Sequence, residues 1–116
     1  MYFEFISPEP RGATWSPAVD ICERTAEIII FVEMPGVDRA DVQLSWNDGV
    51  LIISGQKRQQ PPDQPVARYL CVERPYGYFR REIAIDIRVD QKRAKAELKN
   101  GLMTISLPKM LLRPEE

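Results

Sequence analysis

Side chains that usually carry catalysis are scarce in this chain. It contains no histidine, which excludes Ser-His-Asp and Cys-His catalysis and the two-histidine zinc motifs. Its six glycines never reach the spacing of a phosphate-binding loop or a dinucleotide fingerprint. Asp38 and Asp41 lie in predicted turns, where carboxylates usually hydrogen-bond nearby backbone. We therefore expect no enzymatic activity, no cofactor, no metal and no small-molecule substrate.

Two cysteines, Cys22 and Cys71, are too few for a disulfide framework and too far apart in the sequence for a local zinc knuckle. Free cysteine is among the residue types that are most often buried. The sequence therefore predicts two reduced, buried thiols.

One arginine stands in a row of apolar residues. In the segment GYFRREIAI (77–85), alternation along a strand places Phe79, Arg81, Ile83 and Ile85 on one face. An unpaired guanidinium in an apolar interior is heavily penalised, so Arg81 needs a carboxylate or a carbonyl, which a subunit interface can supply. The alternative is a rim position, where the stem packs and the charged head reaches water.

Composition and charge describe one ordinary globular domain. The 116 residues are 44% hydrophobic and 28% charged, and the formal net charge is -1, so no basic field invites nucleic acid. No apolar run approaches the roughly 18 residues that span a bilayer, and no basic N-terminal segment precedes an apolar stretch. We expect a cytoplasmic protein without nucleic-acid or membrane partners.

Strand signals recur along the whole chain, separated by turn signals such as MPGV (34–37), NDG (47–49) and RPYG (74–77). The polar, proline-rich segment QKRQQPPDQP (56–65) is typical of a surface loop. AKAELK also suits a helix by propensity but is short for one. The pattern predicts an all-β antiparallel sandwich. Its expected strands are AVDICE (18–23), EIIIFVE (27–33), DVQLSW (41–46), VLIISGQ (50–56), ARYLCVE (67–73), GYFRREIAI (77–85), AKAELK (94–99) and LMTISLPK (102–109).

Five segments together carry a resemblance to a known family: WSPAVDICE (15–23), EMPGV (33–37), LIISGQKR (51–58), ERPYGYFRREIAI (73–85) and AELKNGLMTISLPK (96–109). In order and spacing the chain resembles the α-crystallin domain of bacterial or plant-type small heat shock proteins. The resemblance implies an immunoglobulin-like sandwich with a strand-exchange loop. It also implies an ATP-independent holdase that binds partly unfolded client proteins. The domain is then expected at 15–109, with a short arm at 1–14 and a short tail at 110–116.

The resemblance further implies a homodimer in which ARYLCVE crosses over to pair with the partner's AVDICE. Pairing an exposed edge across chains is a general remedy for unpaired backbone groups. The family carries an arginine in the pattern Tyr-Gly-x-Phe-x-Arg, matched here by Arg81. Because the two cysteines lie on strands that meet, mild oxidation is expected to cross-link some dimers. The expected interface residues are Val19, Ile21, Cys22, Tyr69, Cys71, Glu73 and Arg81.

Client binding needs exposed apolar surface, and two regions can supply it. Two strands resemble the groove-forming pair of the family, although their residues can instead face the core. The N-terminus is rich in aromatic residues and can either contact clients or fold over a bare edge. The groove candidates are Val42, Leu44, Trp46, Ala94, Ala96 and Leu98, and the N-terminal candidates are Tyr2, Phe3, Phe5 and Ile6.

The chain also departs from the family pattern. Members usually carry a C-terminal Ile-x-Ile-type motif that docks in a neighbour's groove, whereas here MLLRPEE follows Lys109, and Ala94 is small where the family prefers a larger aliphatic residue. We expect a dimer or small oligomer with weaker chaperone activity than a longer member. The rival interpretation is a co-chaperone or scaffold-type β-sandwich that docks on a larger chaperone complex and holds no clients.

Overall fold

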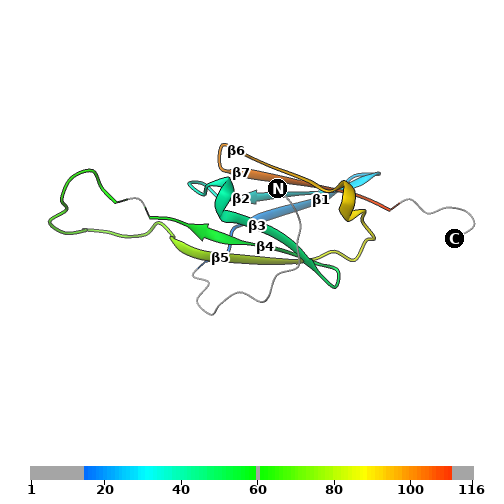
Figure 1. Ribbon diagram of the computed structural model, residues 1–116, viewed down its shortest axis with the longest axis horizontal. Helices are drawn as coiled ribbons and strands as arrows, with labels where there is room; N and C mark the ends of the chain where they lie inside the picture. The colour runs from blue at the N-terminus through cyan, green and yellow to red at the C-terminus, as the bar shows by residue number, and fades with distance from the viewer. Residues whose placement is uncertain (1–14, 60, 111–116) are drawn as a thin grey trace, which may run out of the picture.

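The described part of the chain contains seven strands and two short 3-10 helices, joined by turns and loops (Figure 1). The computed structural model describes residues 15–59 and 61–110. The elements are β1 (Val19–Glu23), β2 (Glu27–Glu33), η1 (Arg39–Asp41), β3 (Val42–Asn47), β4 (Val50–Lys57), β5 (Gly77–Ala84), η2 (Gln91–Arg93), β6 (Lys95–Lys99) and β7 (Leu102–Pro108).

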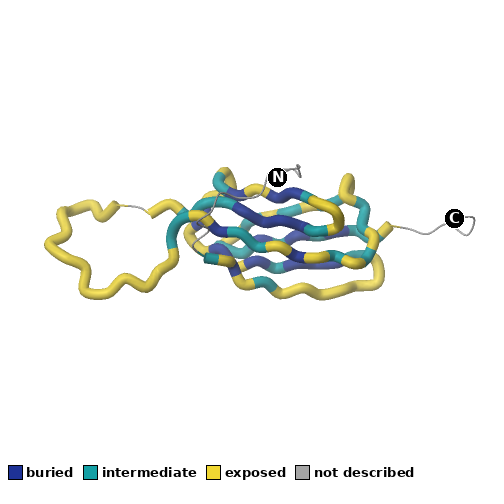
Figure 2. The backbone as a smooth tube through the Cα atoms, turned by 90° about the horizontal axis from the view of Figure 1, so that it is seen from below, coloured by how far each residue is buried: buried dark blue, intermediate teal, exposed yellow. Residues whose placement is uncertain are grey.

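The strands form two sheets packed face to face (Figures 1 and 2). One sheet has the order β1-β2-β7-β6 and the other the order β3-β4-β5. All pairings between these strands are antiparallel. The predicted all-β antiparallel sandwich is confirmed, and four of its strands, β1, β6, β3 and β5, lie at sheet edges.

Local turn chemistry closes two of the hairpins. Asp48 and Gly49 connect β3 to β4 with φ angles of 51° and 80°, and Asn100 and Gly101 connect β6 to β7 with φ angles of 53° and 78°. Two consecutive residues with positive φ are typical of the type I′ turn, whose twist matches that of the flanking strands. Asn, Asp and Gly tolerate this conformation, so both hairpins form where the sequence predicted them.

The core lies between the two sheets and follows the period of two along the strands. In β7, Met103, Ile105 and Leu107 are buried while the intervening residues are partly exposed. Burying each such side chain is worth roughly 1.5–3 kcal/mol. The core side chains are Ile28, Ile30, Val32, Met34, Val37, Val42, Leu44, Leu51, Ile53, Phe79, Ile83, Met103, Ile105 and Leu107.

Two expectations are wrong for the single subunit. Residues 67–73 form no strand, and residues 61–75 are exposed throughout (Figure 2). The reason is that this loop extends beyond the end of the sandwich, where none of the seven described strands lies beside it to pair with its backbone (Figure 1). Cys22 and Cys71 are exposed rather than buried, because one lies on the edge strand β1 and the other on this loop.

Candidate functional site

Strand β1 has an open side. The carbonyl of Ala18 accepts a hydrogen bond from the N–H of Glu33 at 3.0 Å, and the N–H of Arg24 donates one to the carbonyl of Glu27, the first residue of β2, at 2.7 Å. Because hydrogen-bonding direction alternates along an antiparallel strand, the backbone groups of Val19, Ile21 and Glu23 point away from β2. No strand among the described residues pairs with them. This edge can therefore accept a further strand.

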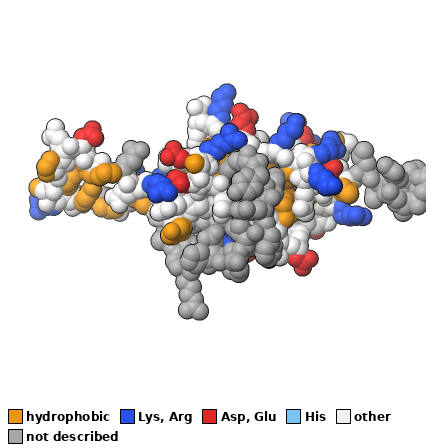
Figure 3. Space-filling model, viewed as in Figure 1, with side chains coloured by type: hydrophobic (Ala, Val, Ile, Leu, Met, Phe, Trp, Pro, Cys, Tyr) orange, Lys and Arg blue, Asp and Glu red, His pale blue; other side chains and the backbone are white. Residues whose placement is uncertain are grey.

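The loop between β4 and β5 displays apolar side chains. The exposed fraction is 84% for Leu70, 67% for Val72, 57% for Tyr69 and 44% for Val66. Figure 3 shows hydrophobic side chains gathered on the segment that protrudes from the sandwich. Soluble proteins rarely leave such a group uncovered unless it meets a partner. The interface residues expected from the sequence include Tyr69 but not Leu70 and Val72, although the alternation in ARYLCVE indicates a second apolar face.

Charged side chains fix the base of this loop to the sandwich. Arg58 donates two hydrogen bonds to Asp41, from Nε to Oδ2 at 2.9 Å and from Nη2 to Oδ1 at 3.1 Å. These hydrogen bonds, and the positive charge of Arg58, hold the pKa of Asp41 below its ordinary value. At the other end of the loop, the cations of Lys57 and Arg74 lie 5.6 Å and 5.1 Å from the ring centre of Tyr76. These contacts lie at the two ends of the loop, and residues 61–73 between them are exposed.

Arg81 occupies the position that its spacing predicted. It lies between Phe79 and Ile83 on the core-facing row of β5, opposite the buried Ile53 of β4. The side chain is only partly buried, and it makes no ion pair within the described residues. β5 is an edge strand of its sheet, and beside it only Trp15, among the described residues, forms an isolated bridge, with Phe79.

The groove candidates divide into two groups. Val42 and Leu44 are buried in the core, so the prediction that they line an open groove is wrong, and the core alternative holds because both face the opposite sheet. Four others are partly exposed and pack against the core: Trp46 from the edge strand β3, Ala94 just before β6, and Ala96 and Leu98 from the edge strand β6. The N-terminal candidates Tyr2, Phe3, Phe5 and Ile6 lie outside the described residues.

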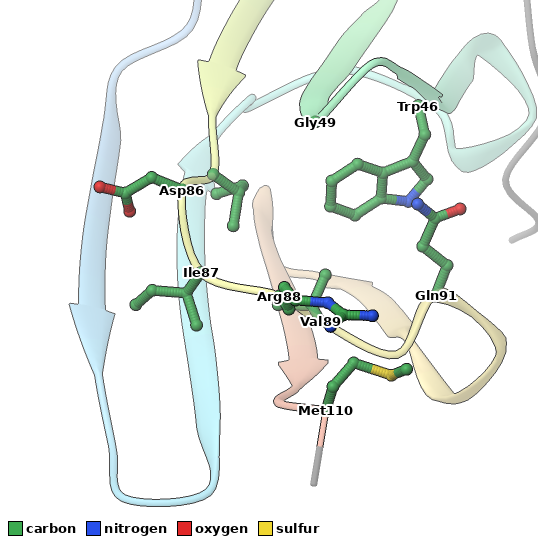
Figure 4. Close-up of a pocket in the computed structure, with 9 residues that line it drawn as sticks. Trp46, Gly49, Asp86, Ile87, Arg88, Val89, Gln91 and Met110 are labelled. Atoms are coloured by element: carbon green, nitrogen blue, oxygen red, sulfur yellow. The ribbon is translucent and has the colours of Figure 1, made fainter. Parts of the chain in front are cut away.

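A shallow pocket opens beside Trp46. Its volume is about 260 Å³, and it lies between the β3–β4 turn and the segment that follows β5 (Figure 4). The apolar side chains of Ile87, Val89 and Met110 meet the polar groups of Arg88 and Gln91 around it. The pocket adds a mixed surface next to the β3 edge.

Within the described residues, no group of three or more Cys, Asp or Glu side chains is placed to hold a metal ion. The same part of the chain contains no helix long and apolar enough to cross a membrane. The same residues carry an open strand edge, an apolar loop and partly exposed residues at the sheet edges.

Comparison with known proteins assigns this architecture to a family. The model of the Hsp20/alpha crystallin family matches residues 20–115. Heat shock protein 16 of Schizosaccharomyces pombe is 34% identical over 95% of this chain and 81% of its own length. Small heat shock protein C4 of Rickettsia felis is 35% identical over 81% of this chain, which spans only 57% of that relative.

Comparison with solved structures supports the same family assignment. Heat shock protein 16.0 from Schizosaccharomyces pombe superposes with a TM-score of 0.74 at 36% identity, over 81% of this chain and 86% of that one. A small heat-shock protein from Xylella fastidiosa gives 0.75 at 30% identity, over 87% and 92%. The chain belongs to the Hsp20/alpha crystallin family of small heat shock proteins, with plant and bacterial members among its relatives.

Proposed function

We propose that this chain is an ATP-independent holdase that works as a homodimer, in which residues 67–73 of each subunit pair with β1 of the other. One observation carries the proposal: a single subunit has both an edge that lacks a strand and an apolar strand-like segment that lacks a sheet. The strand-like segment of one subunit could therefore pair with the open edge of the other. Family membership supports the same arrangement, because self-association and client holding are expected of small heat shock proteins.

The proposal assigns roles to two sets of residues. The subunit interface comprises Val19, Ile21, Cys22, Tyr69, Cys71, Glu73 and Arg81, to which the exposure in the structure adds Leu70 and Val72. Clients are held by partly exposed residues on and beside the β3 and β6 edges, Trp46, Ala94, Ala96 and Leu98, together with the N-terminal residues Tyr2, Phe3, Phe5 and Ile6. Holding a client requires only exposed apolar surface, so no catalytic step and no nucleotide enter the proposal. A cytoplasmic location remains part of it.

An aggregation assay tests the holding activity. A model enzyme is unfolded by heat without ATP, and its light scattering is followed as the chain is added in increasing molar ratio. We expect scattering to fall toward that of the soluble enzyme near one dimer per client. Unchanged scattering at a several-fold excess would reject the holdase and favour the co-chaperone or scaffold interpretation.

The dimer is tested separately by the double variant Leu70→Ser/Val72→Ser. Both side chains are exposed in the subunit, so their replacement should leave its fold unchanged while it removes apolar area from the paired segment. Sedimentation velocity should show the variant as a monomer under conditions in which the wild type is a dimer. Val66→Ser is the matched control, since Val66 is also apolar and exposed but lies outside residues 67–73. Equal masses for the double variant and the wild type would contradict the exchange.

A further inference from the structure

We propose one specific register for this exchange, in which Ile21 lies opposite the partner's Leu70 and Val19 opposite the partner's Val72. The inference rests on the proposed dimer and defines which side chains meet in it. It follows from the faces of the two segments and from the charges beside them.

The two faces of β1 are set by its pairing with β2. Val19, Ile21 and Glu23 lie opposite core residues of β2, and Asp20 and Cys22 lie opposite the residues between them. Residues opposite each other in a sheet share a face. The first three side chains therefore point to the interior side of the sandwich, and Asp20 and Cys22 point outward.

The two faces of residues 67–73 differ in polarity. Leu70 and Val72 alternate with Tyr69, Cys71 and Glu73. The aliphatic face belongs on the interior side, because burying Leu and Val there is favourable whereas burying Glu73 without a partner is not. Leu70 and Val72 then share a face with Val19 and Ile21, which leaves only registers that differ by steps of two residues.

Charge selects one of these registers. In the proposed register Glu23 faces the partner's Arg68, a pair of opposite charges. The carboxylate of Glu23 already accepts from Lys109 through Oε2, and its other oxygen can accept from the arginine.

The two neighbouring registers, shifted by two residues in either direction, give less favourable residue pairs. A shift of two residues one way places Asp20 opposite the partner's Glu73, and like charges directly opposite are destabilising. A shift of two residues the other way places Ile21 opposite the partner's Arg68, so that the guanidinium loses Glu23 as its partner and lies against an aliphatic side chain instead. Only the proposed register matches two apolar pairs and one ion pair at once.

The register also places the thiols. The partner's Cys71 lies opposite Asp20, and Cys22 lies on the diagonal. Because the backbone groups of Asp20 point toward β2, this pair is a non-hydrogen-bonded one, with a Cα separation of about 4.5 Å, which a disulfide can bridge. The diagonal separation of about 7–8 Å is too long for Cys22 and Cys71 without movement of the backbone.

Cross-linking tests the register. In the variant Asp20→Cys/Cys22→Ser, glutathione disulfide should join position 20 to the partner's Cys71. For each bond the two protein thiols lose two electrons and two protons, and one glutathione disulfide is reduced to two thiols. On non-reducing gels we expect dimer to form at least tenfold faster than in the wild type, which has only the diagonal pair. Adding Cys71→Ser to the variant is the control for random collision and should abolish the band.

Each other outcome overturns the register in a distinct way. Faster cross-linking of the wild type than of the variant would show that Cys22 is directly opposite Cys71, the register shifted by two residues. Absence of cross-links in a protein that sediments as a dimer would reject the register and leave the dimer intact. A monomeric mass for the wild type would reject the proposed dimer itself.

Discussion

Arg81 is a charged side chain in a row that otherwise belongs to the core. Its neighbours on the row, Phe79 and Ile83, are buried, and the guanidinium has no ion-pair partner within the described residues of its own subunit. A partner at the dimer interface would satisfy it, whereas in the rim alternative water would do so. The two explanations differ in what removal of the charge does.

We predict that Arg81→Ala and Arg81→Met both weaken the dimer. Breaking a buried charge pair typically costs about 3–5 kcal/mol, so the dimer dissociation constant should rise by roughly a hundredfold or more, measured by sedimentation over a dilution series. Methionine keeps the apolar stem without the charge, so it separates packing from pairing. A methionine variant that dimerises as tightly as the wild type would support the rim position instead.

Between elements, the pair of Arg58 and Asp41 ties the end of β4 to η1. The hydrogen bonds from Arg58 lower the pKa of Asp41 in the folded state. Stability from this pair is therefore fully present above the carboxyl pKa of the unfolded chain, about 4, and is lost as the pH falls through the lower folded-state pKa.

We predict that Asp41→Asn lowers the thermal midpoint at pH 7 by a small amount, as expected for an exposed pair, and that the difference from the wild type vanishes at the acid end. Calorimetry between pH 7 and pH 2 measures it. Asp38→Asn is the control, because Asp38 precedes η1 without a side-chain cap hydrogen bond. A difference that persists unchanged at pH 2 would contradict the role of the Asp41 charge.

Which elements the sequence could predict depends on where their partners lie. The hairpins at Asp48 and Asn100 were predictable because their turn chemistry is local, and the strands because alternation reports the buried face. Residues 67–73 carry the same alternation but form no strand, since their proposed partner lies on another chain. The burial of Val42 and the exposure of the two thiols could not be predicted without the folded structure, because residue type alone does not show which edge or face of a sheet is covered.

The whole molecule is a sandwich with a separable loop. The core side chains come from the strands and from the β2–β3 connection, and none comes from the described residues 58–59 and 61–76. Lys57 and Gly77, which flank this loop, lie directly opposite each other in the β4–β5 pairing. The hydrophobic core of the sandwich therefore forms without the loop, to which the Arg58–Asp41 pair adds only a surface contact, while the proposed assembly depends on the loop.

We predict that replacing residues 58–76 with Asn-Gly yields a folded monomer. A two-residue turn of this type closes an antiparallel pair whose flanking residues are directly opposite. Its circular dichroism should match that of the wild type, and its thermal midpoint should not depend on concentration. The wild-type midpoint should rise with concentration, because association stabilises by mass action. As a control, replacing residues 60–65 with Gly and Ser keeps residues 67–73 and should preserve the dimer. A loop-free variant that still sediments as a dimer would show that the subunits associate through another surface.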